Sequence, residues 1–230
     1  MALHNRLTEL LGIERPIIQG GMAVRISLSP LAGAVAKAGG IGIIAGSGLT
    51  PEELRQEIRA ARSMSDGLIG VNIMVAIKAF REMAEAALDE GIDLFAGAGF
   101  SRDVFGWCRE AGVAMVPIVG SVRVAVLSEK FGAAAVIVEG VEAGGHLGTD
   151  RPMRELLPEI VAAVSIPVIG AGGVVTGADI REVLALGAAG VQMGTRFAAT
   201  VESSAPDAFK QMYVNATPDD VVLIKSPVGL

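Results

Sequence analysis

Short runs of Val, Ile, Leu and Ala alternate along the chain with segments whose apolar residues recur at helical spacing. Eight such runs occur, and each has the length of one strand. Continuous apolar runs are typical of parallel strands that are buried on both faces. The pattern therefore predicts eight buried parallel strands, at 16–19, 40–45, 68–73, 94–96, 114–119, 134–139, 167–170 and 190–193.

The segments between these runs carry signals of helix starts and ends. Pro51 fits the first turn of a helix, with Thr50 as its N-cap and Glu53 completing a capping box. Apolar residues at helical spacing predict further helices at 78–90, 156–164, 178–186 and 206–213. Glycine supplies the left-handed residue that ends many helices. We expect this role for Gly39, Gly91, Gly112, Gly132 and Gly187.

Eight alternations of strand and helix without a long linker predict a parallel α/β fold. The sheet could close into a barrel or stay open and doubly wound. Eight strands favour the barrel, and so does the lack of a dinucleotide-binding fingerprint, because Val175 stands where the third glycine of 170–175 should be. We therefore expect an eight-stranded parallel (β/α)8 TIM barrel, with residues 1–230 as a single domain.

Composition and charge narrow the functional classes. Hydrophobic residues make up 51% of the 230 residues, but no apolar run approaches the roughly 18 residues of a membrane span. The N-terminal segment lacks the apolar core of a signal peptide, and the single cysteine, Cys108, excludes an intramolecular disulfide, so we expect a cytoplasmic protein. The net charge of −6 without a basic block argues against nucleic acid or an anionic membrane as a partner.

Glycine-rich and polar residues follow the predicted strands, at the rim where barrel enzymes carry their chemistry. Gly172, Gly173, Gly194 and Thr195 follow the last two strands, where barrels often bind a phosphate through backbone N–H groups. Ala171 comes directly before this set. The alternative for these glycines is that they only form tight turns.

His146 lies among glycines in the loop after the sixth strand and is the candidate catalytic residue, because histidine exchanges protons near neutral pH. An exposed loop histidine is the alternative. Glu139 ends the sixth strand and could orient a neighbour or be a solvated carboxylate. Asn72 could hold a ligand or cap a turn. No group of residues has the spacing of a metal site, and no G-x-S-x-G motif of a serine hydrolase occurs.

Five motifs together resemble the nitronate monooxygenase (2-nitropropane dioxygenase) family, which includes flavin-dependent enoyl-acyl-carrier-protein reductases. The resemblance covers nearly the whole chain, and the Glu-Ala-Gly-Gly-His loop is its most specific part. The motifs lie at 19–22, 71–74, 142–148, 171–173 and 194–197. Members of this family usually continue well past the position of Leu230, so we expect the chain to lack a C-terminal extension.

The resemblance implies a barrel that binds FMN non-covalently, with His146 as the catalytic histidine beside the flavin. It implies that the residues after the first strand lie against the flavin ring and that the glycines of the last two loops hold its phosphate. The cofactor-binding residues expected on this basis are Gly21, Met22, Ala23, Asn72, Glu139, Ala171, Gly172, Gly173, Gly194 and Thr195.

Three functions remain open at this stage. The first, and the one favoured by the sequence, is oxidation of alkyl nitronates by oxygen to carbonyl compounds and nitrite. The second is NADH-dependent reduction of an enoyl-acyl-carrier protein, with NAD(P)H as co-substrate and the carrier protein as partner. The third is a phosphate-binding barrel without redox activity. The partner expected for the first two is a small-molecule substrate, a nitronate or an enoyl thioester, and a homodimer is compatible with either.

Overall fold

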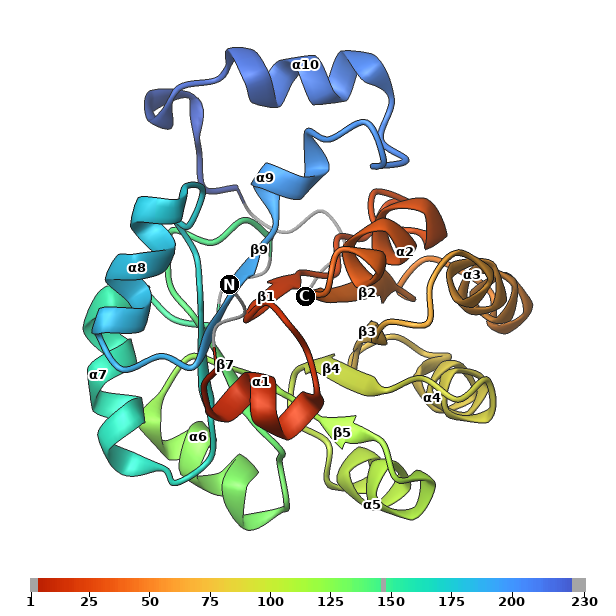
Figure 1. Cartoon of the computed structure of the whole chain (residues 1–230), viewed down its shortest axis with the longest axis horizontal. Helices are drawn as coiled ribbons and strands as arrows, with labels where there is room; N and C mark the ends of the chain where they lie inside the picture. The colour runs from red at the N-terminus through yellow and green to blue at the C-terminus, as the bar shows by residue number, and fades with distance from the viewer. Residues whose placement is uncertain (1–3, 146–147, 225–230) are drawn as a thin grey trace.

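The computed structural model describes residues 4–145 and 148–224, and within them the strands form one parallel sheet. The order of the strands is β5-β4-β3-β2-β1-β9-β8-β7-β6. Because β5 and β6, at the two ends of this order, belong to one stretch of chain, the sheet curls until its edges meet (Figure 1). The strands are β1 (Ile17–Gln19), β2 (Ile41–Ala45), β3 (Ile69–Met74), β4 (Leu94–Ala98), β5 (Ala114–Met115), β6 (Ile118–Val119), β7 (Val136–Glu139), β8 (Val168–Ala171) and β9 (Gly190–Met193).

The barrel closes along residues 114–119, where one strand is predicted and the structure has two. β5 pairs with β4, and β6 pairs with β7. Between them the Val116 N–H donates to the Phe95 carbonyl at 2.9 Å, and the Pro117 carbonyl accepts from the Ile137 N–H at 2.9 Å. Proline has no N–H and cannot continue a strand ladder normally, so it interrupts the strand. The predicted (β/α)8 barrel is confirmed, with its fifth strand in two pieces.

Helices follow the strands and surround the sheet (Figure 1). They are α1 (Arg6–Leu11), α2 (Ser29–Lys37), α3 (Pro51–Met64), α4 (Phe80–Asp89), α5 (Arg102–Ala111), α6 (Val122–Lys130), α7 (Met153–Ala163), α8 (Gly177–Ala185), α9 (Thr195–Ala198) and α10 (Asp207–Asn215), with a 3-10 turn at Pro218–Asp220. The predicted capping box of α3 is present, because the Glu53 N–H donates to Thr50 Oγ1 at 3.2 Å and the Thr50 N–H donates to Glu53 Oε2 at 2.8 Å. All five glycines predicted to end helices have positive φ.

The side chains of each strand alternate between the barrel interior and the surrounding helices. Gly42 faces α2, since a Cβ at this position would overlap the Ala32 carbonyl. Its neighbours Ile41 and Ile43 point the other way and pack in an interior cluster that includes Leu7 of α1. Thus α1 closes the amino-terminal end of the barrel, and a larger apolar layer lies between strands and helices.

The C-terminal segment packs differently from the rest. No residue of α10 is buried, and this helix lies outside the ring of helices around the sheet (Figure 1). Met212 and Val214 are exposed, as are the apolar residues at 221–224. In the described part of the chain, no helix is both long enough and apolar enough to cross a membrane.

Candidate active site

The strand ends that carry the predicted site residues are neighbours on the carboxyl-terminal rim of the barrel. Gln19 is in register with Met193, Gln192 with Ala171, and Ala171 with Glu139. The loops after β1, β9, β8 and β7 therefore leave the barrel side by side. This is the rim at which barrel enzymes assemble their active sites.

Three polar side chains form the uppermost inward-facing layer of the barrel. The alternation that places Ile137 and Ile43 in the interior also directs Glu139, Asn72 and Gln192 inward. Asn72 and Glu139 are predicted site residues, whereas Gln192 is not. The signal for Gln192 was its position as an inward-facing polar residue one place before the end of a buried strand.

Glu139 is half-buried at the end of β7. Within residues 4–145 and 148–224 no hydrogen bond or ion pair to its carboxylate is found. Burial without a compensating partner disfavours the charged form, and it raises the pKa of Glu139 to about 7. The structure therefore gives this residue a property that the sequence did not reveal, namely a carboxyl group that can hold or release a proton near neutral pH.

The loop after β1 connects two other parts of the predicted site. Gly21 lies against Asn72, because a Cβ at Gly21 would stand 2.5 Å from the Asn72 Cβ. Only glycine fits at that distance. Met22 extends toward the end of β9, the strand that pairs with β1. Its Sδ lies 3.8 Å from the position of a Cβ on Gly194. Ala23 is exposed in the turn that follows.

This turn holds two residues in the left-handed region, Val24 at φ 57° and Arg25 at φ 61°. A β-branched residue rarely adopts this conformation, and such strain is concentrated at functional sites. Neighbouring side chains stabilise the turn: Ser27 Oγ accepts from the Met22 N–H at 2.8 Å, and Arg25 Nη2 lies 2.5 Å from Glu53 Oε1. Ser27 thereby holds the backbone of Met22 in place, and the Arg25–Glu53 pair ties the turn to α3.

The last two strands end in the glycine turns predicted to bind phosphate. Ala171 is buried, and after it Gly172 and Gly173 have φ values of 111° and 62°. Gly194 precedes the short helix α9, which begins at Thr195. A Cβ on Gly194 would meet no atom nearer than 3.8 Å, so the space beside the backbone is open there. Glycine turns at the ends of adjacent barrel strands are places where backbone N–H groups often bind a phosphate.

Two charged side chains beside the Gly172–Gly173 turn were not recognised as site residues from the sequence. Glu142 is exposed, but both of its carboxylate oxygens accept from the Met153 N–H at 3.1 Å, and its Cγ lies 3.2 Å from the Cβ position of Gly172. Arg154, at the start of α7, approaches Gly173 with its Nη1. Only the packing of α7 beside the β8 turn brings them together.

The predicted catalytic residue, His146, lies outside the described residues, as does Leu147. The described ends of its loop lie on the candidate rim. The Val141 N–H donates to the Arg151 carbonyl at 2.9 Å, and the Gly148 carbonyl packs against Gly120, where a Cβ would stand 2.5 Å from it. Among the described residues, no three His, Cys, Asp or Glu side chains are grouped to hold a metal ion.

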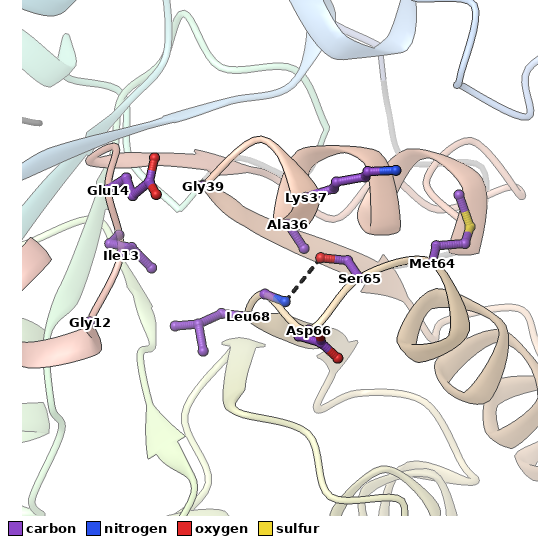
Figure 2. Close-up of a pocket in the computed structure, with 12 residues that line it drawn as sticks. Gly12, Ile13, Glu14, Ala36, Lys37, Gly39, Met64, Ser65, Asp66 and Leu68 are labelled. Atoms are coloured by element: carbon purple, nitrogen blue, oxygen red, sulfur yellow. Dashed lines mark hydrogen bonds between the residues drawn. The ribbon is translucent and has the colours of Figure 1, made fainter. Parts of the chain in front are cut away.

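A hollow of about 450 Å³ lies at the opposite rim and is lined by residues that precede β1, β2 and β3 (Figure 2). Glu14, Lys37 and Asp66 contribute its charges, and the Gly67 N–H donates to Ser65 Oγ at 2.9 Å. None of the predicted site residues lines it. Because the amino-terminal rim of a barrel serves stability rather than catalysis, we place the candidate site at the other rim.

Comparisons with known proteins identify the family to which the chain belongs. The family model described as nitronate monooxygenase matches residues 4–98 and 94–229. A curated relative from Staphylococcus aureus, described as a probable nitronate monooxygenase, is 31% identical, and the match covers 98% of this chain and 76% of the relative.

Two curated relatives have higher identity. They are named (3aS,4S,5R,7aS)-5-hydroxy-7a-methyl-1-oxo-octahydro-1H-indene-4-carboxyl-CoA dehydrogenase. The protein from Mycobacterium tuberculosis is 38% identical over 100% of this chain, and that from Rhodococcus jostii is 35% identical over 99%. The chain spans 65% and 64% of the lengths of these two relatives.

Solved structures show the same architecture. FabK from Thermotoga maritima superposes with a TM-score of 0.90 at 37% identity, covering 94% of this chain and 69% of FabK. Nitroalkane oxidase from Streptomyces ansochromogenes superposes with a TM-score of 0.82 at 31% identity, covering 90% of this chain and 72% of the oxidase. The family model matches almost the whole length of this chain. The chain therefore belongs to the nitronate monooxygenase family of oxidoreductases.

Proposed function

We propose that the chain is the FMN-binding barrel of a flavin-dependent oxidoreductase. The observation that carries this proposal is the pair of adjacent glycine turns after β8 and β9, which lie on the same rim as Met22 and the inward polar layer. Backbone N–H groups in such turns suit a phosphate, and the space beside Gly194 is open.

The expected roles of the residues follow from their places on the rim. Gly172, Gly173, Gly194 and Thr195 would hold the phosphate, and Gly21, Met22 and Ala23 would lie along the ring. Asn72 packs against Gly21, and its side-chain amide would offer a polar group to the cofactor. Bound FMN would supply the electron or hydride transfer, and the protein would supply position and electrostatics.

His146 remains the proposed catalytic residue. With a nitronate it would stabilise the negative charge, or take a proton from the neutral nitroalkane. With an enoyl thioester it would polarise the substrate or donate a proton. Glu139, on the same rim, is a second group that can hold a proton near neutral pH.

Two substrate classes are proposed. Nitronates follow from the family model and from the relatives named for nitro compounds. Acyl thioesters are favoured by the two carboxyl-CoA dehydrogenases, whose 38% and 35% identities exceed the 31% of the nitronate monooxygenase relative. We rank a CoA thioester first on this order of similarity. For reduction of an enoyl thioester, NAD(P)H would be the co-substrate, and acyl-carrier protein would be an alternative carrier of the acyl chain.

Flavin binding is the first test. Purified protein should carry FMN or take it up when FMN is added, with the absorption spectrum of a bound flavin. Protein that remains colourless and takes up no FMN would contradict both oxidoreductase proposals and favour a phosphate-binding barrel without redox activity.

A pair of assays then separates the substrate classes. A nitronate monooxygenase consumes oxygen with an alkyl nitronate in the absence of NADH and releases nitrite. A thioester oxidoreductase oxidises NADH or NADPH when crotonyl-CoA is added and leaves nitronates unchanged. We expect the second result, and nitrite release without thioester turnover would reverse the ranking.

A further inference from the structure

Arg154 presents its guanidinium to the glycine turn after β8. Its Nε and Nη2 donate to the two carboxylate oxygens of Glu182 at 2.9 and 3.0 Å. This bidentate pair fixes the plane of the guanidinium and leaves Nη1 on the side of Gly173, 3.4 Å from the position of a Cβ on that glycine. Within residues 4–145 and 148–224, no hydrogen-bond acceptor is found for Nη1.

The surroundings of this turn are otherwise acidic. Glu142, Asp179 and Glu182 all lie within electrostatic range of Arg154. Glu142 accepts from the first N–H of α7, and Asp179 accepts from the Thr176 N–H at 2.7 Å at the start of α8. A phosphate dianion at Gly172 and Gly173 would be repelled by these carboxylates unless a cation lay between them. Arg154 occupies that place. Its Nε and Nη2 donate to Glu182, and Nη1 has no acceptor in the described part of the chain.

We propose that Arg154 is a ligand of the flavin phosphate and makes the site select FMN over riboflavin. This proposal rests on the proposed FMN-binding function. Glu182 positions the guanidinium, and Nη1 donates to a phosphate oxygen above the Gly172–Gly173 turn. A guanidinium bound in this way serves two anions at once, because its planar fork offers donors on separate edges.

The test compares two flavins that differ only in the phosphate. Protein freed of flavin is titrated with FMN and with riboflavin, and the two Kd values are measured by flavin fluorescence. Arg154→Gln should weaken FMN binding about tenfold or more and riboflavin binding less than about twofold, as expected for the loss of one charge-assisted hydrogen bond. Arg154→Lys should keep part of the preference for FMN, because the charge remains while the fork that pairs with Glu182 is lost.

Arg151→Gln is the matched control. Arg151 lies just before the same helix and makes an equivalent bidentate pair with Glu159, at 2.7 and 2.9 Å. This variant should bind both flavins as the unmodified protein does. Circular dichroism confirms that each variant is folded.

Three results would overturn the proposal. If Arg154→Gln binds FMN as tightly as the unmodified protein, Arg154 does not contact the phosphate. If it weakens both flavins equally, Arg154 only supports the structure of the turn. If the unmodified protein binds neither flavin, both the proposed FMN-binding function and the proposed role of Arg154 fail. In the first two results the unmodified protein still binds FMN, so only the role of Arg154 fails.

Discussion

Glu139 ends β7 with its carboxyl group turned into the barrel and without a described partner. Burial disfavours the charged carboxylate, so the folded protein binds this proton more tightly than the unfolded chain does. The stabilisation linked to the proton is fully present below the ordinary pKa of 4.5 and is lost as the pH rises through about 7.

Glu139→Gln should remove this dependence on pH. We expect the variant to match the unmodified protein near pH 4.5 and to be more stable at pH 8, by at most about 3 kcal/mol. Urea unfolding at pH 5, 6, 7 and 8 measures the difference. A constant gap between the two proteins across this range would mean that Glu139 does not titrate there.

His146→Ala should retain FMN and lose turnover. General acid–base catalysis contributes about two to four orders of magnitude, so kcat should fall by about a hundredfold or more. His4→Ala is the matched control, because His4 is exposed near the chain start and the sequence assigns it no catalytic role. Equal kcat in the two variants would remove His146 from the mechanism.

Sequence reasoning can propose residues near strand ends more readily than residues that converge from elsewhere. Gly21 and Gly194 follow recognisable strands, and Asn72 lies near the end of β3. Arg154 could not be proposed in this way, because its place depends on how α7 packs beside the β8 turn. Glu139 was identified as a position, but its raised pKa depends on burial that only the fold defines.

At the scale of elements, glycines decide how closely the helices approach the sheet. A Cβ on Gly42 would overlap the backbone of α2, whereas a Cβ on Gly106, within α5, would meet no atom within 4 Å. The first glycine is required by packing. The second is not, and in a helix interior it lowers stability relative to alanine.

The two alanine variants should therefore change stability in opposite directions. Gly42→Ala should destabilise the protein by more than about 3 kcal/mol, because the backbone of α2 must move. Gly106→Ala should stabilise it by about 0.5–1 kcal/mol. Urea midpoints measure both changes. A mild loss in Gly42→Ala would show that α2 can shift away from β2 without cost.

The strands and the helices α3, α4, α7, α8 and α10 were predicted from hydrophobic runs and caps, whereas α1 was not predicted. Among the strands, the main difference is the fifth, where the run 114–119 is apolar throughout and the break is at Pro117. The pattern of apolar residues does not show that Pro117 lacks the backbone N–H that a strand ladder needs. The proline itself was the available signal, and it lies where the two edges of the sheet must join.

At the scale of the whole molecule, the C-terminal segment contributes little buried surface to the barrel. No residue of α10 is buried, and the apolar side chains at 221–224 are exposed. A cluster of exposed apolar side chains is typical of an interaction surface or of a tendency to associate.

Removal of residues 207–230 should therefore leave the barrel intact. We expect the Tm to change by less than about 3 °C, which corresponds to about 1 kcal/mol for a protein of this size. Sedimentation velocity should show less association at high concentration. A large loss of Tm would show that the segment packs on the barrel more firmly than its exposure indicates.

The interrupted strand at Pro117 has a consequence for motion. The edges of the sheet are joined there by two-residue strands and isolated bonds, whereas β2 and β3 share four register pairs. Opening of the barrel should therefore begin at this junction, and the amide hydrogens of Val116 and Ile137 should exchange with deuterium sooner than those of Ile43 and Ile44. Opening there would separate residues 114–119 from β4 or from β7, while the strand pairs elsewhere in the sheet stay protected.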